Sequence, residues 1–372
     1  MKNISVCEPF VGAQERRNVV DCWRTNWISS RGEYIEKYER SFADFCGLKY
    51  AIATTSGTSA LHLSLLALNI NSGDEIIVPT FTMAATIFSI LYVGAKPVLV
   101  DSEPDTFNID PNKIERLITK KTRAILAVHL YGHPCEMNCL VDIARRNRLF
   151  LIEDAAEAHG AEYGGRKVGT FGIISAFSFY ANKIITTGEG GMVVTDNKKL
   201  AKRVAVLKDM AFNPRKRFIH NYLGYNYRMT NIQAAIGLAQ MKKINEFIER
   251  RRRNAVRYGQ LLKDIPGITL PVERANVKNV YWMYAILVNK EFGMSKDLLR
   301  QRLKVNGIET RDFFIPTHKQ PFFRKLGIFV KEDFPIADGI SKKGAYLPSG
   351  TGLKIDEIVY IVTQIKKIRS GV

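Results

Sequence analysis

The sequence alternates short apolar runs with helical patterns from its start to about residue 240, and this feature limits the possible folds most. Apolar runs that end in polar or small residues are typical of buried strands. Predicted strands include 76–78, 97–100, 124–128, 149–152 and 192–194, and predicted helices include 59–68, 111–118 and 137–147. The alternation predicts an α/β fold with a mostly parallel central sheet. Ligands of such sheets bind beyond the carboxyl ends of the strands.

The pattern changes after about residue 240. A long charged helix is predicted over 241–262, Pro266-Gly267 closes it, and a mixture of strand and helix patterns follows. We therefore predict a large domain over residues 1–244 and a smaller α+β domain over residues 245–372. We expect roughly the first 12 residues to pack with the smaller domain.

The chain is basic, with 55 Lys and Arg against 36 Asp and Glu and a net charge of +19. This balance favours anionic partners, namely nucleic acid, a membrane surface or phosphorylated small molecules. The basic runs 215–217 and 250–253 have no interleaved aromatic residues, and we interpret 250–253 as a solvated helix face. We expect no nucleic-acid partner, although a basic nucleic-acid-binding protein remains an alternative of a different class.

An uncharged segment, 76–95, is about as long as a membrane span. Pro79 and Gly94 interrupt it, so we predict a strand, a buried helix and a second strand here and expect no membrane partner. The five cysteines lack the spacing of zinc or redox motifs and predict free thiols in the cytoplasm. His129 and His133 could form a metal site with Cys135, but neighbouring Gly and Pro argue against a helix there, and we expect no metal.

Three segments combine residue types that can carry chemistry. In the first, a predicted strand leads through Ser56, Gly57 and Thr58 into a helix. The first turn of a helix has unpaired N–H groups and a partial positive charge, so it can hold a phosphate. An ordinary capped helix start has the same residue types.

The other two segments carry an acid and an amine. Glu153 and Asp154 lie at the carboxyl end of the predicted strand 149–152, beside small residues that leave room for a flat ligand. Lys183 follows another strand and precedes a glycine-rich loop. Partial burial lowers the pKa of such an amine and makes it a usable nucleophile. A solvated strand end and a surface lysine are the alternatives for each segment taken alone.

Together the three segments match the requirements of pyridoxal phosphate. Lysine forms a Schiff base with its aldehyde, a helix N-terminus holds its phosphate, and an aspartate keeps its ring nitrogen protonated. The protonated ring draws electrons from the bond that is being broken. We therefore predict Lys183 and Asp154 as the catalytic residues of a pyridoxal-phosphate enzyme.

The sequence also resembles the sugar-nucleotide aminotransferases, a vitamin B6-dependent family with the aspartate aminotransferase fold (fold type I). The resemblance covers nearly the whole chain. Its motifs are, in chain order, Trp27-Ile-Ser-Ser, Ser56-Gly-Thr, Val128-His-Leu-Tyr-Gly-His-Pro, Glu153-Asp-Ala-Ala-Glu-Ala, Phe177-Ser-Phe-Tyr-Ala-Asn-Lys and Gly224-Tyr-Asn-Tyr-Arg-Met-Thr-Asn. The first and third motifs, with Tyr281-Trp-Met, most resemble the branch of the family that forms GDP-perosamine.

The resemblance implies a role for each matching residue. Lys183 matches the Schiff-base lysine and Asp154 the partner of the ring nitrogen. The other implied cofactor contacts are Ser56, Gly57, Thr58, Met83, Glu157, Ser178 and Asn226, and the implied substrate contacts are Trp27, Ser29, Arg31 and His318. Met83 occupies a place where many relatives have an aromatic residue, and a methionine can also cover a ring face. Asn226 is implied to reach the neighbouring subunit, which makes a homodimer with shared active sites.

The implied reaction moves an amino group from L-glutamate, which becomes 2-oxoglutarate, to C4 of a nucleotide-linked 4-keto-6-deoxyhexose. GDP-4-keto-6-deoxymannose is the substrate that the closest branch implies, with GDP-perosamine as the product for a surface glycan such as the lipopolysaccharide O-antigen. A UDP- or dTDP-linked 4-keto or 3-keto sugar is one alternative. A pyridoxal-phosphate dehydratase of the same fold is another, although some relatives that remove a sugar hydroxyl have histidine where this chain has Lys183.

Overall fold

The computed structural model describes residues 3–213, 215–216, 218–329 and 332–371. Its main feature is a seven-stranded sheet with the order β1-β9-β8-β5-β4-β2-β3. The strands are β1 (Tyr50–Thr54), β2 (Glu75–Pro79), β3 (Lys96–Val100), β4 (Thr122–Val128), β5 (Phe150–Asp154), β8 (Ile174–Ser178) and β9 (Gly191–Thr195). β9 runs antiparallel to both of its neighbours, β1 and β8, and the other neighbouring strands in this sheet are parallel. The predicted α/β class with a mostly parallel sheet is confirmed.

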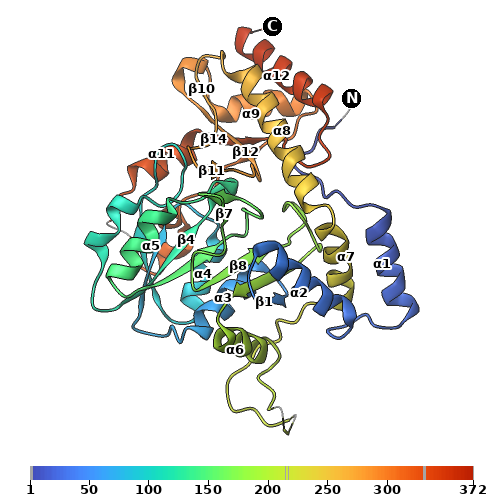
Figure 1. Cartoon of the computed structure of the whole chain (residues 1–372). Coiled ribbons are helices and arrows are strands. Elements are labelled where there is room, and N and C mark those ends of the chain that lie inside the picture. The colour runs from blue at the N-terminus through green and yellow to red at the C-terminus, as the bar shows by residue number, and fades with distance from the viewer. Residues whose placement is uncertain (1–2, 214, 217, 330–331, 372) are drawn as a thin grey trace.

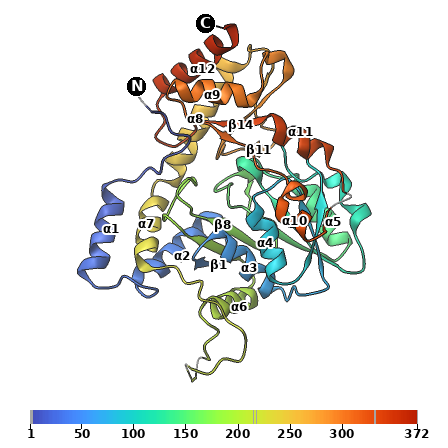
Figure 2. The same cartoon turned by 180° about the vertical axis from the view of Figure 1, so that it is seen from behind.

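Helices cover both faces of this sheet (Figures 1 and 2). The helices of this part of the chain are α1 (Ala13–Arg24), α2 (Glu33–Cys46), α3 (Gly57–Ala67), α4 (Ala84–Tyr92), α5 (Met137–Arg146), α6 (Lys198–Lys208) and α7 (Asn231–Met241), of which α1 lies outermost and packs on α7. Along β4, Leu126 belongs to the core beneath α3, whereas its neighbours Ile125 and Ala127 belong to the core beneath α5. Because successive strand residues point to opposite faces, a sheet covered on both faces needs the continuous apolar runs seen in the sequence.

The chain after α7 forms a second sheet. The long helix α8 (Ile244–Leu262) leads to an antiparallel sheet with the order β10-β12-β14-β13. Its strands are β10 (Ile268–Thr269), β12 (Tyr284–Val288), β13 (Arg311–Asp312) and β14 (Gly344–Leu347), and its helices are α9 (Lys296–Val305), α10 (Pro321–Lys325), α11 (Pro335–Lys343) and α12 (Ile355–Ser370). A separate apolar core joins α8, α9 and α12 to this sheet. The predicted boundary between residues 244 and 245 falls at the start of α8 and stays a prediction.

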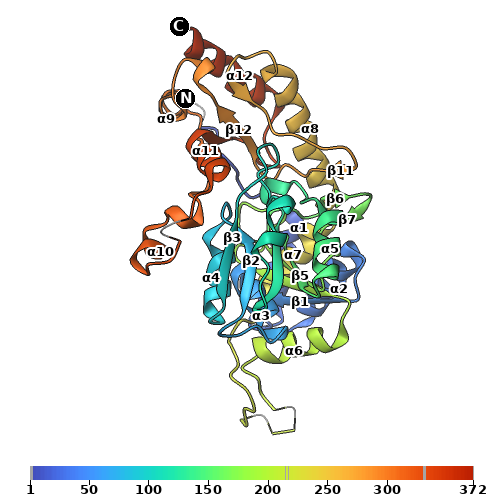
Figure 3. The ribbon, with the colours of Figure 1, turned by 90° about the vertical axis from the view of Figure 1, so that its left-hand side faces the viewer.

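Smaller elements join these parts. Near the N-terminus, Ile4 pairs with Ile308, and the Ser349 N–H donates to the carbonyl of Val6, so this segment lies against the second sheet. A three-stranded sheet joins β11 (Val277–Lys278) to β6 (Glu162–Tyr163) and β7 (Arg166–Lys167). Between α6 and α7, the described part of residues 209–229 (all but 214 and 217) forms a segment that we call the arm, and part of it projects away from the body (Figure 3).

Three expectations about local structure need correction. Residues 111–118 form two short 3₁₀ turns, Pro111–Lys113 and Glu115–Leu117, instead of one α-helix. The charged helix begins at Ile244 and not at residue 241. α7 ends at Met241, and Lys242 and Lys243 form a turn between the two helices. Within 250–253, Arg251 is buried and not solvated. Its guanidinium donates to the carbonyls of Trp282 and Ser349, which lie just outside β12 and β14.

Candidate active site

A cavity of about 460 Å³ lies at the carboxyl edge of the large sheet. Val128, Asp154 and Ser178, the last residues of three neighbouring strands, all line it. Residues after α8 close it from the opposite side, namely Trp282, Arg311 and Phe314. The cavity therefore lies where ligands bind in parallel sheets, and it is lined both by the seven-stranded sheet and by the part of the chain that forms the four-stranded sheet.

The N-terminus of α3 opens into this cavity. Ser56 is its N-cap, and the Ser56 Oγ accepts a hydrogen bond of 3.1 Å from the Ser59 N–H. The first turn of α3 contains no acidic residue, so its partial positive charge is not cancelled there. Ser56, Gly57, Thr58 and Ser178 all line the cavity, and their role as phosphate contacts stays a prediction.

Close packing at this turn requires glycine. A Cβ at position 57 would lie 2.8 Å from the Cβ of Ser178, and a Cβ at position 191 would lie 2.1 Å from the carbonyl oxygen of Ser56. Both glycines thus bring the backbone of α3 within reach of β8 and β9. The result is a cradle of N–H and hydroxyl groups that matches the size and donor chemistry of a phosphate.

Asp154 lies opposite the phosphate cradle, at the end of β5. Its carboxylate accepts hydrogen bonds from the Thr86 hydroxyl at 2.8 Å and from the Ala156 N–H at 3.1 Å. Burial raises the pKa of Asp154 above its ordinary value, while these donors and the charge of Lys183 oppose the increase. A buried carboxylate of this kind is suited to hold a protonated ring nitrogen, because such a cation restores the balance of charge.

Lys183 brings its amine to the same cavity. Its Nζ lies 3.7 Å from the Glu157 Oε1, and the side chain is 10% exposed. Burial lowers the pKa of Lys183, and the carboxylates of Glu157 and Asp154 partly restore it. Burial also raises the pKa of Glu157 to about 7, although Lys183 and the Tyr131 N–H oppose this. The amine therefore has a pKa below its ordinary value and lies beside a carboxyl group that can gain and lose a proton near pH 7.

Three further residues of the cavity were not predicted to have a role. Thr86 on α4 (Ala84–Tyr92) holds Asp154, and its hydroxyl also lies 3.0 Å from that of Thr82, which precedes the helix, so no helical spacing in the sequence marked Thr86. Trp282 places its ring over the Lys183 amine, and Arg311 is the guanidinium among the described residues that line the cavity. Both lie more than 90 residues beyond Lys183, so no local motif joins them to it.

The structure brings most predicted cofactor residues together and places the predicted substrate residues elsewhere. Met83 and Glu157 line the cavity with Lys183 and Asp154. Trp27 and Arg31 line a different cavity of about 840 Å³, and Ser29 lies beside it, where its carbonyl accepts from the Asn231 N–H. The remaining two lie apart from both: Asn226 is exposed at the base of the arm, and His318 is buried between Thr80 and Asp338. Their roles stay predictions.

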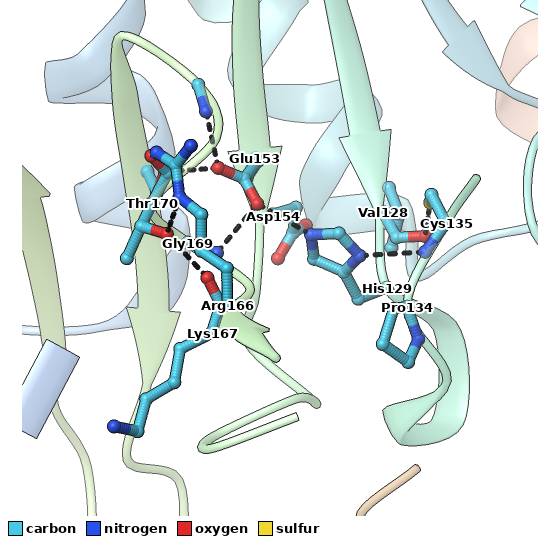
Figure 4. Close-up of polar contacts among 12 residues, drawn as sticks. Val128, His129, Pro134, Cys135, Glu153, Asp154, Arg166, Lys167, Gly169 and Thr170 are labelled. Carbon is cyan, nitrogen blue, oxygen red and sulfur yellow. Dashed lines mark hydrogen bonds and ion pairs between the residues drawn. The ribbon is translucent and has the colours of Figure 1, made fainter. Parts of the chain in front are cut away.

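A polar network beside Asp154 contains His129 and Cys135 (Figure 4). His129 Nε2 lies 3.0 Å from the buried Glu153 carboxylate, and its Nδ1 accepts from the Cys135 N–H. Burial opposes ionisation of Glu153, but the His129 bond and two backbone N–H groups hold the pKa of Glu153 below its ordinary value. In the described part of the chain, no three His, Cys, Asp or Glu side chains are grouped to hold a metal ion.

The residues of the cavity fit pyridoxal phosphate. A phosphate cradle at α3, a buried carboxylate and a buried amine line one space, and the buried Asn182 Oδ1 in its wall has no hydrogen-bond partner among the described residues. An anionic group, a ring nitrogen and an aldehyde are the complementary chemistry.

Comparison with known proteins identifies the family. The model of the DegT/DnrJ/EryC1/StrS aminotransferase family matches residues 9–366. This chain belongs to that family. It is 43% identical to the GDP-perosamine synthases of Caulobacter vibrioides (98% of this chain, 99% of the relative) and Escherichia coli O157:H7 (100% of each). The structure is similar to that of DesV from S. venezuelae, with a TM-score of 0.92, 31% identity and complete coverage of both chains.

These findings confirm the predicted family and fold and the aminotransferase class of the enzyme. The structure of PseC, an aminotransferase of Helicobacter pylori, has a TM-score of 0.93 at 27% identity and also covers both chains completely. The fold therefore extends over the whole chain, including the segment after α8. No helix among the described residues is both long and apolar enough to cross a membrane.

Proposed function

We propose that this protein is a pyridoxal-phosphate-dependent aminotransferase that transfers the amino group of L-glutamate to C4 of GDP-4-keto-6-deoxymannose. The product is GDP-perosamine, for a surface glycan. Three relatives with 41–43% identity over nearly their whole length are named GDP-perosamine synthase, which supports this choice of sugar nucleotide. The observation that carries the reaction type is the placement of Lys183, Asp154 and the N-terminus of α3 around one cavity.

The residues divide the chemistry among them. Pyridoxal phosphate supplies an aldehyde that takes up the amino group and a ring that draws electrons from the bond being broken. Asp154 holds the proton on the ring nitrogen, and Thr86 fixes the orientation of Asp154. Ser56, Gly57, Thr58 and Ser178 bind the phosphate at α3, and Met83 covers one face of the ring.

Lys183 has two functions. Its Nζ would hold the cofactor through the aldehyde group, and as a free amine it would move a proton at the Cα of glutamate. The Glu157 Oε1 lies 3.7 Å from the Lys183 Nζ, so the carboxylate stabilises the amine while the amine carries a proton. The keto sugar then reacts at the site that glutamate has left, so the two substrates bind in turn.

We further propose a homodimer in the cytoplasm. Asn226, at the base of the arm, reaches the cofactor phosphate of the partner subunit, and Trp27, Ser29 and Arg31 contact substrate across the same interface. Their exposure away from the cavity of their own chain supports this arrangement. The five cysteines are free, which supports a reducing compartment.

Visible spectra test the cofactor chemistry. The wild-type protein with added pyridoxal phosphate is expected to show the absorption of the lysine-bound cofactor, and the Lys183→Ala variant is expected to lack it. Identical spectra of the two proteins contradict the assignment of Lys183.

Nitrogen transfer tests the reaction type and the substrate. Glutamate with ¹⁵N, supplied with a panel of GDP-, UDP- and dTDP-linked keto sugars, is expected to label the product of the GDP sugar. Product without ¹⁵N identifies a dehydratase instead, and label in a UDP or dTDP product changes the nucleotide of the proposal.

A further inference from the structure

Trp282 differs from the other two tryptophans of the chain. Its side chain is 4% exposed, whereas Trp23 and Trp27 are 70% and 55% exposed. It lies just before β12, on the second sheet, and yet it lines the cavity at the edge of the first sheet. A large aromatic ring from one part of the chain therefore forms a wall of a site built mainly by the other.

Hydrogen bonds hold both the indole ring and the backbone of Trp282. The indole Nε1–H donates to the carbonyl of Asn182 at 2.9 Å, and the carbonyl of Trp282 accepts from the buried Arg251 at 2.7 Å. Arg251 also donates to the carbonyl of Ser349 on the loop after β14. Because Asn182 directly precedes Lys183, the first bond sets the position of the ring relative to the backbone of the lysine.

The Lys183 amine lies against the face of this ring. Its Nζ is 3.7 Å from the ring centroid and, on another side, 3.7 Å from the Glu157 Oε1. An ammonium group over the face of tryptophan is attracted by the ring quadrupole, and the attraction is strongest where water is excluded. The side chain of Lys183 is largely buried, so the ring and the carboxylate replace most of the water that a free ammonium needs.

We propose that Trp282 is a positioning residue that holds the free ammonium group of Lys183 beside Glu157 while this amine is not bound to the cofactor. The inference rests on the proposed function, since an aminotransferase must release its lysine amine and recover it in each cycle. A long side chain without a fixed contact samples many rotamers. The reaction is slower because the amine is within reach of the reacting carbon in only some of them. The indole confines the amine to one location within reach of the reacting carbon.

The contact itself can be tested in the protein without cofactor. A Trp23→Phe/Trp27→Phe protein has Trp282 as its single tryptophan, so its fluorescence reports on this ring alone. We expect the emission to change as the Lys183 amine loses its proton with rising pH, and we expect Lys183→Met to abolish this change. Lys208→Met is the matched control, because Lys208 pairs with Glu39 and should leave the titration intact.

Other groups that face the amine remain in the Lys183→Met variant. They are Asp154, Glu157 and His159 from the segment that begins at β5, and Cys7 from the N-terminal segment, with Arg251 behind the indole. A titration that persists in Lys183→Met belongs to one of these groups and overturns the proposed contact.

The role in the reaction is tested by two substitutions of Trp282. Leucine removes the aromatic face and the N–H, whereas phenylalanine keeps a face and loses only the N–H. We expect Trp282→Leu to slow the return of the lysine-bound absorption in the keto-sugar half-reaction by about thirtyfold, the factor that follows from losing a desolvated cation–π contact. Trp282→Phe should recover a large part of this loss.

The outcomes separate the two proposals. A Leu variant as fast as wild type, or Leu and Phe variants that are equally slow, contradicts a role for the aromatic face. Absence of ¹⁵N transfer by the wild-type protein contradicts the proposed function, whereas the fluorescence titration tests the contact independently of any turnover.

Discussion

At the scale of single residues, Glu157 and Lys183 show how burial and pairing set the chemistry of the site. Burial disfavours both charges, so the pKa of the acid rises to about 7 and the pKa of the amine falls, while their attraction opposes both shifts. Glu157 therefore changes its protonation near pH 7, which it would not do in water, and it lies beside an amine whose pKa is below its ordinary value.

A first prediction concerns the pH dependence of turnover. Below about pH 7 the Glu157 carboxylate takes up a proton and no longer holds the Lys183 ammonium, so kcat is expected to fall as the pH falls through this value. Glu157→Gln should lose this inflection and retain a rate lower by about tenfold at higher pH. Glu39→Gln, which alters the remote pair with Lys208, should keep the inflection. An unchanged inflection in Glu157→Gln assigns it to another group.

His159 gives a second prediction, on acid stability. It is buried among Phe42, Phe177 and Phe179, and neither ring nitrogen has a hydrogen-bond partner among the described residues. Burial, with the charge of Lys183, lowers the pKa of His159 to about 3. Between pH 6.5, its ordinary pKa, and about pH 3, His159 is protonated in the unfolded chain and neutral in the folded protein. The free energy of unfolding therefore falls as the pH falls through this range.

His159→Phe and His159→Leu are expected to remove this dependence. Urea unfolding of the cofactor-free protein measures it, and the wild type should lose about 1.4 kcal/mol more than the variants per pH unit below 6. Equal pH slopes in wild type and both variants contradict the assignment. Two replacements are used because the larger phenylalanine can strain the aromatic cluster around the site.

At the scale of secondary structure, the sequence predicted best those strands that helices cover on both faces of the sheet. Runs such as 124–128 predicted strands correctly, because a sheet covered on both faces needs apolar residues at every position. Residues 111–118 were predicted as a helix and form 3₁₀ turns. In this short segment Asp110 caps the first turn and Pro111 starts it, but too few residues follow to build a stable α-helix.

The start of α3 is the element that gives a third prediction. Gly57→Ala places a Cβ 2.8 Å from the Cβ of Ser178 and forces the phosphate cradle open. The cost of overpacking, about 1–3 kcal/mol, corresponds to cofactor binding weaker by about five- to hundredfold. Titration of the cofactor-free variant with pyridoxal phosphate measures the change.

Gly259→Ala is the matched control for this substitution. Gly259 lies within α8, and no atom lies within 4 Å of an added Cβ there. The change should leave cofactor affinity as in wild type and stabilise the fold by about 0.5–1 kcal/mol, because alanine loses less backbone entropy in a helix. Equal cofactor affinity in Gly57→Ala and wild type contradicts the role of the cradle.

At the scale of the whole molecule, the sequence allowed prediction only of those site residues that lie at the ends of strands in the large sheet. Asp154 and Ser178 come together because parallel strands end at one edge, and a strand pattern in the sequence is enough to infer this. Trp282 and Arg311 reach the same cavity from the second sheet, and Arg251 anchors its wall from α8. Such contacts depend on how two parts of the chain pack, for which a single sequence holds no local signal.

The predicted residues outside the cavity raise the question of assembly. Trp27, Ser29 and Arg31 are exposed near the start of α2, and Asn226 is exposed at the base of the arm, with Tyr222 and Leu223 exposed further along it. A monomer leaves all of them without a function in catalysis. A second copy of the chain can use them, since a twofold interface presents the same surfaces of both subunits to each other.

The last prediction tests this by mixing two inactive variants. Lys183→Ala lacks the amine of its own cavity, and Asn226→Ala lacks the residue expected to reach the partner's phosphate. In a mixed dimer, one of the two sites receives Lys183 from one subunit and Asn226 from the other, whereas the second site lacks both. Co-expressed variants should therefore recover about a quarter of wild-type activity, since half of randomly formed dimers are mixed and each has one intact site. If Asn226 acts within its own chain, every site in the mixture lacks one of the two residues and activity stays at the level of the separate variants.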